Sequence, residues 1–228
     1  YIWVKVPSLK PEREHWKIHG NDTRNQLAAG IPMAFQFAIT ASGTMIMQSA
    51  INLFGSVAVA AYTAAAKLQS LVIQGMIAMG QTMATYCGQN LGAGRIDRVK
   101  KGIRLGIFYT CIWCTLNIVT AYTIGDWLVW LVTGSKTPEV IYNATLYLKV
   151  DTLFYYVTAV ICIVRNSMQG LGERIVPLIS SSLEMIGKIV IAATLVPMFG
   201  YPGVIAAEPI VWFIMIIPLL MKILRMPV

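Results

Sequence analysis

The sequence predicts an all-α, multi-pass membrane protein with six transmembrane helices. Of its 228 residues, 57% are hydrophobic and 12% are charged, whereas a soluble domain carries about 25% charged residues. The mean hydropathy is +0.65. Uncharged runs long enough to cross a bilayer, which takes about 20 residues, recur along the chain. Lys and Arg gather between these runs, which is typical of helices embedded in a membrane.

Turn signals and charges divide the apolar runs into helices. The uncharged run 25–66 is too long for one crossing, so we expect a break at Asn52–Ser56. Charge is also absent between Arg104 and Asp126, and the turn PMFGYPG separates the last two helices. The segment WLVWLVT at 127–133 either extends the third helix or lies at the membrane interface. The predicted helices cover about residues 27–51, 57–87, 102–125, 138–168, 174–196 and 203–224.

The first 26 residues differ from the rest of the chain. Residues 1–26 are polar and basic and contain Pro7 and Pro11, which predicts a linker or a surface-lying segment. Residues 27–228 form the transmembrane domain. Both histidines lie in the N-terminal segment without a third ligand nearby, so we predict no metal site.

Basic residues predict the orientation of the chain. With the N-terminal segment placed in the cytoplasm, five Lys or Arg precede the first helix and five lie between Arg95 and Arg104. Arg174, Lys222 and Arg225 fall on the same side, whereas the outer loops contain Lys136 alone. This asymmetry follows the positive-inside rule and places both ends of the chain in the cytoplasm. The net charge of +8 therefore reflects topology, and we expect no nucleic-acid partner.

Motifs of enzymes are absent from the sequence. The chain has no GxxxxGK[ST] loop for a nucleoside triphosphate, no HExxH motif and no plausible Ser-His-Asp set. We therefore predict no catalytic residue and no enzymatic activity.

Ionisable side chains inside the predicted helices are the strongest functional signal, because each costs about 2.5–3.5 kcal/mol at the centre of a membrane helix. Glu184 and Lys188 lie one turn apart in the fifth helix and are placed to pair. Lys67, at comparable depth in the second helix, could compete for Glu184. Asp151 lies in the fourth helix and Glu208 in the sixth.

Three interpretations of these residues stay open. They form a static network that fixes helix packing, or at least one of Asp151, Glu184 and Glu208 binds a cation or couples to protons. In the third interpretation some of them, mainly Glu208 and Lys149, reach the interface. Gln36 is one of several amides in the apolar helices, and these favour a bundle around a polar passage over an inert anchor.

The stretch GQNLGAGRIDRVKKGIR at 88–104 resembles a phosphate loop at first sight. No β-strand precedes it, however, and a phosphate loop needs one. We interpret it as a hinge-like cytoplasmic loop whose glycines allow a tight turn and whose basic residues keep it inside. The signature residues are Gly88, Gln89, Asn90, Gly92 and Gly94.

Six blocks in order along the chain resemble the second half of a MATE (multidrug and toxic compound extrusion) transporter. This family is a branch of the multidrug/oligosaccharidyl-lipid/polysaccharide exporter superfamily, and the likeness is greatest to its branch from Gram-positive anaerobes. The blocks are LAAGIPMAFQ, AVAAYTAAAKLQSL, GQNLGAG, RNSMQGLGE, SSLEMIGKIV and FGYPGVIAAEPIVW.

The resemblance implies a twelve-helix protein of two six-helix lobes around a central cavity. Such a protein sits in the bacterial plasma membrane and exports organic, often cationic, compounds in exchange for Na⁺ or H⁺, with no other cofactor. Residues 1–26 would then be the cytoplasmic linker, and the N-terminal lobe would be the partner of this one. One departure concerns Thr40, which stands where some branches carry a glutamate eight residues after the proline, here Pro32. The cation site of those branches is therefore not transferred to this chain.

We expect a secondary-active multidrug exporter, an antiporter that works by alternating access. One alternative is a lipid-linked or polysaccharide flippase of the same superfamily. Another, from a different class, is a non-transporting membrane scaffold subunit.

Overall fold

The computed structural model describes residues 20–226, and within that range the chain consists of helices and turns with no strand. Helix α2 (Gly20–Ile51) leads through a 3-10 turn, η3 (Asn52–Phe54), into α3 (Gly55–Gly92). Gly55 has a φ of 84°, which glycine adopts at little cost, and the chain reverses there. Residues 1–19 of the predicted linker, with both histidines, lie outside the described range, and the helix already begins at Gly20.

The third predicted helix is longer in the structure. Helix α4 (Ile96–Thr133) includes WLVWLVT at 127–133 and has a kink at Ile124, where φ and ψ leave the helical region. Continuing the helix keeps the backbone polar groups of this apolar segment hydrogen-bonded inside the chain. The segment therefore extends the helix, which was one of the two expected outcomes.

The predicted single helix 138–168 is divided in two. Helices α5 (Pro138–Leu153) and α6 (Tyr155–Gly170) meet at Phe154 with a bend of 55°. Sharp kinks usually occur at Pro or Gly, and neither residue lies at this break. The local sequence therefore gave no signal for the division.

The last predicted helices are confirmed in outline, with a short helix between them. Helix α7 (Ile175–Ala193) is followed by α8 (Leu195–Phe199) and by α9 (Tyr201–Ile223). The expected turn at 197–203 is thus partly helical. Gly200, with a φ of 64°, is the residue at which the chain turns into α9.

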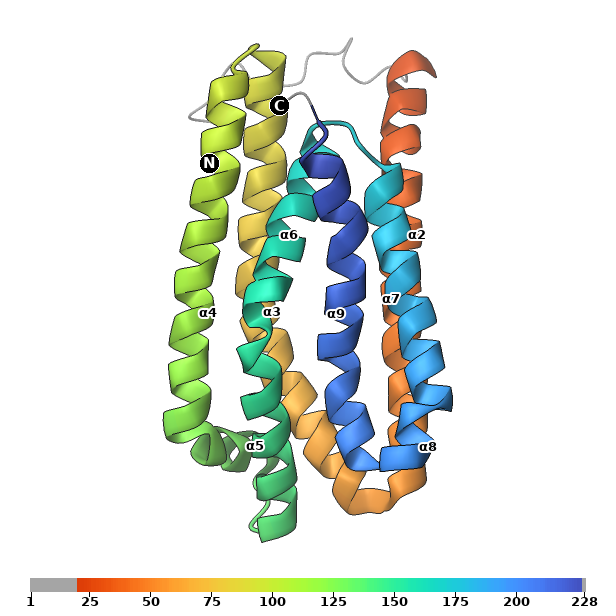
Figure 1. Ribbon diagram of the computed structural model, residues 1–228, viewed down its shortest axis with the longest axis vertical. Coiled ribbons are helices and arrows are strands. Elements are labelled where there is room, and N and C mark those ends of the chain that lie inside the picture. The colour runs from red at the N-terminus through yellow and green to blue at the C-terminus, as the bar shows by residue number, and fades with distance from the viewer. Residues whose placement is uncertain (1–19, 227–228) are drawn as a thin grey trace, which may run out of the picture.

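The membrane-spanning capacity of the described chain agrees with the predicted fold class. Four helical stretches are long and apolar enough to cross a bilayer, or five if the bent α5–α6 pair counts as one span. The longest of them, Gly20–Gly92, contains both α2 and α3, which run in opposite directions (Figure 1). The chain is a multi-pass membrane protein.

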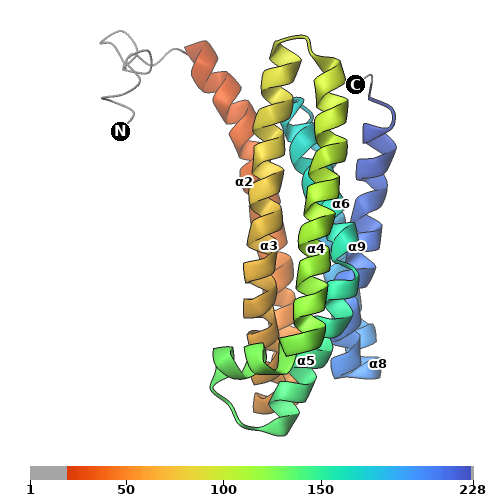
Figure 2. The ribbon, with the colours of Figure 1, turned by 90° about the vertical axis from the view of Figure 1, so that its left-hand side faces the viewer.

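The helices are arranged in two groups. Helix α7 packs on α2 and on α9, while α3 packs on α4 and on α6, and α2 touches α3 at few residues. Figures 1 and 2 show that α2 begins, α3 turns into α4, and α9 finishes at one end of the bundle. The turns from α2 to α3 and from α4 to α5, together with α8, lie at the other end (Figure 1). The alternation of ends matches the predicted topology.

Apolar side chains cover the outside of the bundle, and its core is built mainly from aliphatic residues and Met, with Ala and a few aromatic residues among them. Phe37, Leu116 and Ile217 are examples of large exposed apolar residues, as expected where lipid replaces water. Inside, the rings of Tyr62 and Tyr147 meet edge to face at 5.7 Å.

Candidate functional site

A buried ion-paired cluster lies where α7 meets α9. Lys188 Nζ is 3.1 Å from Glu184 Oε1, one turn earlier on α7, and 2.9 Å from Glu208 Oε1 on α9. The pairing of Glu184 with Lys188, predicted from their spacing, is confirmed. Lys188 and Glu184 are 3% and 5% exposed. One ammonium group therefore holds two carboxylates from neighbouring helices inside the lobe.

Helix α2 closes this cluster from the other side. The Thr40 hydroxyl donates a hydrogen bond to Glu184 Oε2 at 3.2 Å. A Cβ atom placed on Gly43 would lie 3.1 Å from Lys188 Cδ, so α2 passes directly over the lysine side chain. The close approach depends on the small residue at position 43. Thr40, the departure noted in the sequence, is thus part of the cluster.

Arg165 on α6 reaches the same region. Its Nη2 donates to the Ser180 hydroxyl on α7 at 3.3 Å, and its guanidinium interacts electrostatically with Glu184. Arg165 lies near the end of α6, and its half-buried side chain is turned toward the ion pairs. Sequence reasoning missed this role because nothing local to Arg165 indicates Glu184 as a neighbour.

A second acidic position lies at the break between α5 and α6. Asp151 is 1% exposed, and its Oδ2 accepts a hydrogen bond of 2.6 Å from Gln69 Nε2 on α3. Its Oδ1 is buried and has no hydrogen-bond partner among the described residues. The buried Tyr155 hydroxyl, which also has no hydrogen bond of good geometry among the described residues, lies beside this carboxyl and interacts with it as a weak hydrogen-bond partner. Gln69 therefore provides the one hydrogen bond of good geometry that the described residues give this carboxyl.

The structure separates Lys67 from the acidic residues, so the expected competition for Glu184 is wrong. Lys67 is exposed on α3, whereas the oxygens of Glu184 contact Lys188 and Thr40. The helix that covers Glu184 is α2, and α3 packs mainly on α4 and α6. The prediction rested on the similar depth of Lys67 and Glu184 in the membrane. Depth alone does not determine toward which side of a helix a residue points.

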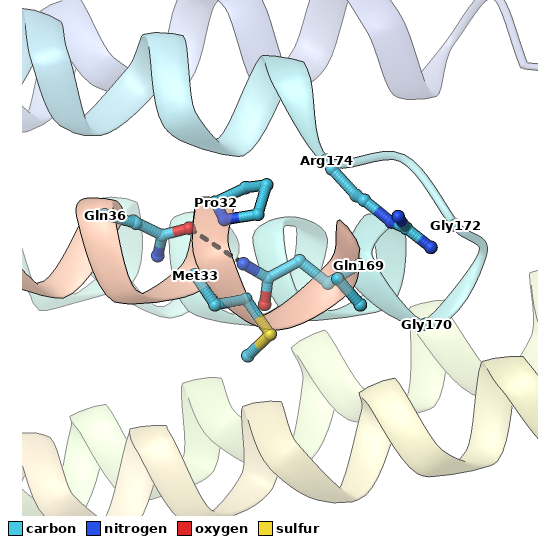
Figure 3. A pocket seen from close by; sticks show the side chains of 8 residues that line it. Pro32, Met33, Gln36, Gln169, Gly170, Gly172 and Arg174 are labelled. Atoms are coloured by element: carbon cyan, nitrogen blue, oxygen red, sulfur yellow. Dashed lines mark hydrogen bonds between the residues drawn. The ribbon is translucent and has the colours of Figure 1, made fainter. Parts of the chain in front are cut away.

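Gln36 lies in a different place, at a pocket between the start of α2 and the end of α6. Gln169 Nε2 donates to Gln36 Oε1 at 2.8 Å, as Figure 3 shows. The pocket has a volume of about 260 Å³. Its lining also includes Pro32, Met33 and Arg174. Gln36 therefore contacts Gln169 rather than either acid, and neither Glu184 nor Asp151 lines this pocket.

The glycine-rich signature is mostly helical, which corrects its interpretation as a hinge-like loop. Four of its residues, Gly88, Gln89, Asn90 and Gly92, lie in the last turns of α3. Gly94, with a φ of 68°, lies in the turn that leads to α4. A Cβ atom on Gly88 would approach the Gly170 carbonyl oxygen at 3.2 Å. Gly88 thus serves helix packing, and Gly94 alone of the five serves the turn.

The two acidic positions differ in what they can do chemically. Within residues 20–226, no group of three or more His, Cys, Asp or Glu side chains is arranged to hold a metal ion. Glu184 and Glu208 are already ion-paired with Lys188. Asp151 retains an unpartnered oxygen in a buried place, so it is the group able to accept a proton.

Comparisons with known proteins identify relatives of this chain. The family model described as MatE matches residues 32–194. Two proteins of Bacillus subtilis (strain 168) are similar to this chain. "Probable multidrug resistance protein YoeA" is 24% identical, and the match covers 71% of this chain and 34% of the relative. "Probable multidrug resistance protein YpnP" is 27% identical, and the match covers 75% of this chain and 37% of the relative. The chain thus spans about a third of these curated relatives. A solved structure described as "Crystal structure of MATE in complex with MaL6" has a TM-score of 0.81, 14% identity, and coverage of 97% of this chain and 52% of its own.

Proposed function

This chain belongs to the MatE family, and from that premise we propose that it forms the C-terminal six-helix lobe of a multidrug exporter. The full transporter exchanges H⁺ for organic, cationic small molecules by alternating access, and an N-terminal six-helix lobe completes its central cavity. The names of the two Bacillus relatives and the membrane-spanning helices of this chain support the proposal.

The observation that carries the proposal is the half-satisfied carboxyl of Asp151. A buried carboxylate without full hydrogen bonding is costly in a membrane protein, and such residues mark ion or proton pathways. A scaffold subunit would gain nothing from a buried carboxylate that lowers its stability. Among the three acids predicted from the sequence, Asp151 is the one that the geometry favours for coupling.

The position of Asp151 fits a coupling role. It lies three residues before the break at Phe154, inside a span bent by 55°. Interrupted helices supply binding sites and moving parts in secondary transporters. Protonation of Asp151 would remove a buried charge next to this bend. If the angle between α5 and α6 depends on that charge, proton binding is coupled to the conformational change.

The same geometry favours a proton over Na⁺. Hard cations require several oxygen ligands, and the described partners of Asp151 are the Nε2 group of Gln69, a donor, and a single hydroxyl, that of Tyr155. A proton requires one free oxygen, which Oδ1 provides. The coupling ion in this proposal is therefore H⁺.

Localisation in the plasma membrane, with both ends of the chain in the cytoplasm, belongs to the same proposal. Arg95–Arg104 opens α4, Arg174 precedes α7, and Lys222 lies in the last turn of α9, all at one end of the bundle. The positive-inside rule assigns that end to the cytoplasm. Cysteines introduced at 95–104 should react with impermeant reagents from inside only, and cysteines at 134–137 from outside only.

The test uses the full-length transporter in proteoliposomes. We expect Asp151→Asn to slow efflux of ethidium driven by a pH gradient by at least about tenfold, because the amide cannot carry the proton. Asp126→Asn, at an exposed aspartate of α4, is the matched control and should transport at the wild-type rate. Normal pH-driven efflux by Asp151→Asn would refute the role of Asp151. Efflux that responds to neither a pH nor a Na⁺ gradient in the wild-type protein would refute the exporter itself.

A further inference from the structure

We infer that Lys188 acts as a built-in monovalent cation, so that its ammonium group fills a place between Glu184 and Glu208 that a free Na⁺ would otherwise take. The inference rests on the proposed function only in treating the chain as one lobe of a cation-coupled transporter. It does not depend on Asp151, which lies at a different helix break.

The surroundings of the ammonium group are those of a small cation. Two carboxylate oxygens from α7 and α9 lie 3.1 and 2.9 Å from Lys188 Nζ. The second oxygen of Glu184 accepts from the Thr40 hydroxyl on α2, so side-chain oxygens of three helices gather at one buried point. Oxygen atoms of carboxylates and hydroxyls are what a hard cation binds. The lysine supplies the positive charge that this arrangement needs.

The charges around the cluster leave no place for a second cation. Two acids, Glu184 and Glu208, face two bases, Lys188 and Arg165, the latter through its electrostatic interaction with Glu184. Asp151, whose carboxyl accepts from Gln69, also interacts electrostatically with Glu208 and Lys188 but contacts neither carboxylate of the cluster. Because Lys188 and Arg165 match the two acids of the cluster itself, a mobile cation bound between Glu184 and Glu208 would add an uncompensated charge to that pair, which is unfavourable.

The ammonium group is tethered in a way that a mobile ion is not. The stem of Lys188 runs under α2 at Gly43, where an added Cβ atom would lie 3.1 Å from Cδ. Helix α2 therefore covers the side chain, which is 3% exposed. A cation held by its own helix stays in place through a transport cycle, whereas a coupling ion must enter and leave. Lys188 thus removes this cluster from ion exchange and leaves coupling to other groups.

The experiment asks whether Na⁺ replaces the ammonium group when the lysine is removed. It uses the purified full-length transporter and compares Lys188→Met with the wild-type protein and with Thr40→Val. The matched control is the triple variant Lys188→Met/Glu184→Gln/Glu208→Gln, which lacks the lysine and both acids. Binding of ²²Na⁺ and the thermal midpoint in NaCl, KCl or choline chloride are measured for each.

We expect Lys188→Met to gain a bound Na⁺ relative to the wild-type protein, and its thermal midpoint to rise with NaCl but not with choline chloride, because ligands that bind the folded state stabilise it. The triple variant should show neither effect. Thr40→Val should leave Na⁺ binding of the wild-type protein unchanged, and adding Thr40→Val to Lys188→Met should weaken the new site by about tenfold.

Three results would overturn the inference. One is a wild-type protein that binds Na⁺ and loses this binding when Thr40→Val or Glu184→Gln is introduced. The acids would then hold a Na⁺ ion although the lysine is present. Another is a folded Lys188→Met protein that gains no Na⁺. The third is aggregation of Lys188→Met in all three salts while the triple variant folds, because no free cation would then replace Lys188. Recovery of an aggregating Lys188→Met protein by NaCl alone would support the inference.

Discussion

The two groups of helices in this lobe hold their buried acids in opposite ways. In the group of α2, α7 and α9, Glu184 and Glu208 share one ammonium group, and Glu184 also accepts from a hydroxyl and interacts with Arg165 of α6. In the group of α3 to α6, the described partners of Asp151 are neutral groups, the Gln69 amide and the Tyr155 hydroxyl. The first arrangement stabilises the fold, whereas the second lowers its free energy of unfolding.

This difference separates structural from functional acids in a membrane protein. All three residues looked alike in the sequence, because each is an acidic side chain in an apolar helix. Removing one partner of a buried ion pair is expensive, because it leaves the other charge unpaired. An unmatched carboxyl remains ready to bind a proton. The degree of pairing, and not burial alone, therefore ranks the three candidates.

Glycines at helix contacts differ in what an added side chain would meet, and breaking a contact with backbone should give the largest effect. An added Cβ atom on Gly170 of α6 would collide with the backbone carbonyl of Ala84 on α3, and backbone cannot move aside. We expect Gly170→Ala to destabilise the protein by on the order of 3 kcal/mol, seen as a loss of monodisperse protein in fluorescence-detected gel filtration.

Gly43 in the other group provides the contrast. The atom that its added Cβ would meet belongs to the flexible stem of Lys188, at 3.1 Å, so Gly43→Ala should cost about 1 kcal/mol or less. Gly30→Ala, where nothing lies within 4 Å, is the neutral control. Equal losses in Gly170→Ala and Gly43→Ala would show that the two groups are packed alike.

The next largest effect on stability should come from removing single acids. Glu208→Gln should lower the stability, whereas Asp151→Asn should leave it unchanged or raise it. Glu208→Gln breaks a charge-assisted contact of 2.9 Å with Lys188, which is worth about 1.5–3 kcal/mol. Asp151→Asn keeps an oxygen for Gln69 and removes an unmatched charge, so its thermal midpoint should equal or exceed that of the wild-type protein. Thermal unfolding of the purified variants measures both.

Transport assays sharpen this contrast. Asp151→Asn should lose pH-driven efflux although it is stable, and Glu208→Gln should lose stability before it loses coupling. A stable Glu208→Gln protein together with a destabilised Asp151→Asn protein would reverse the assignment of the two groups.

Sequence reasoning recovered what depends on local spacing and missed what depends on tertiary contact. The Glu184–Lys188 pair followed from one helical turn, and the turn at Gly55 followed from its residue type. Glu208 joins that pair because α9 packs on α7, which no local pattern indicates. The break at Phe154, which places Asp151 at a bend, has neither Pro nor Gly to mark it.

The smallest expected effect concerns an ion pair between the two groups of helices at one end of the bundle. Glu173, in the turn between α6 and α7, lies 2.8 Å from Lys222 at the end of α9, and its other oxygen accepts from the backbone N–H of Ile175. The hydrogen bond from Lys222 lowers the pKa of Glu173 below its ordinary value. Because the pKa is lowered on folding, this stability is present above the ordinary value, near pH 4.5, and is lost as the pH falls through the lowered one.

Since both side chains are partly exposed, we expect the contact to contribute no more than about 1 kcal/mol. Glu173→Gln should make thermal unfolding less sensitive to pH in the acidic range, and Lys222→Met should do the same. In a double-mutant cycle the effects of the two substitutions should be less than additive, because each removes the same contact. Full additivity would mean that the ion pair contributes nothing, and that the two groups of helices are held together at this end by other contacts, such as the hydrogen bond between Gln169 and Gln36.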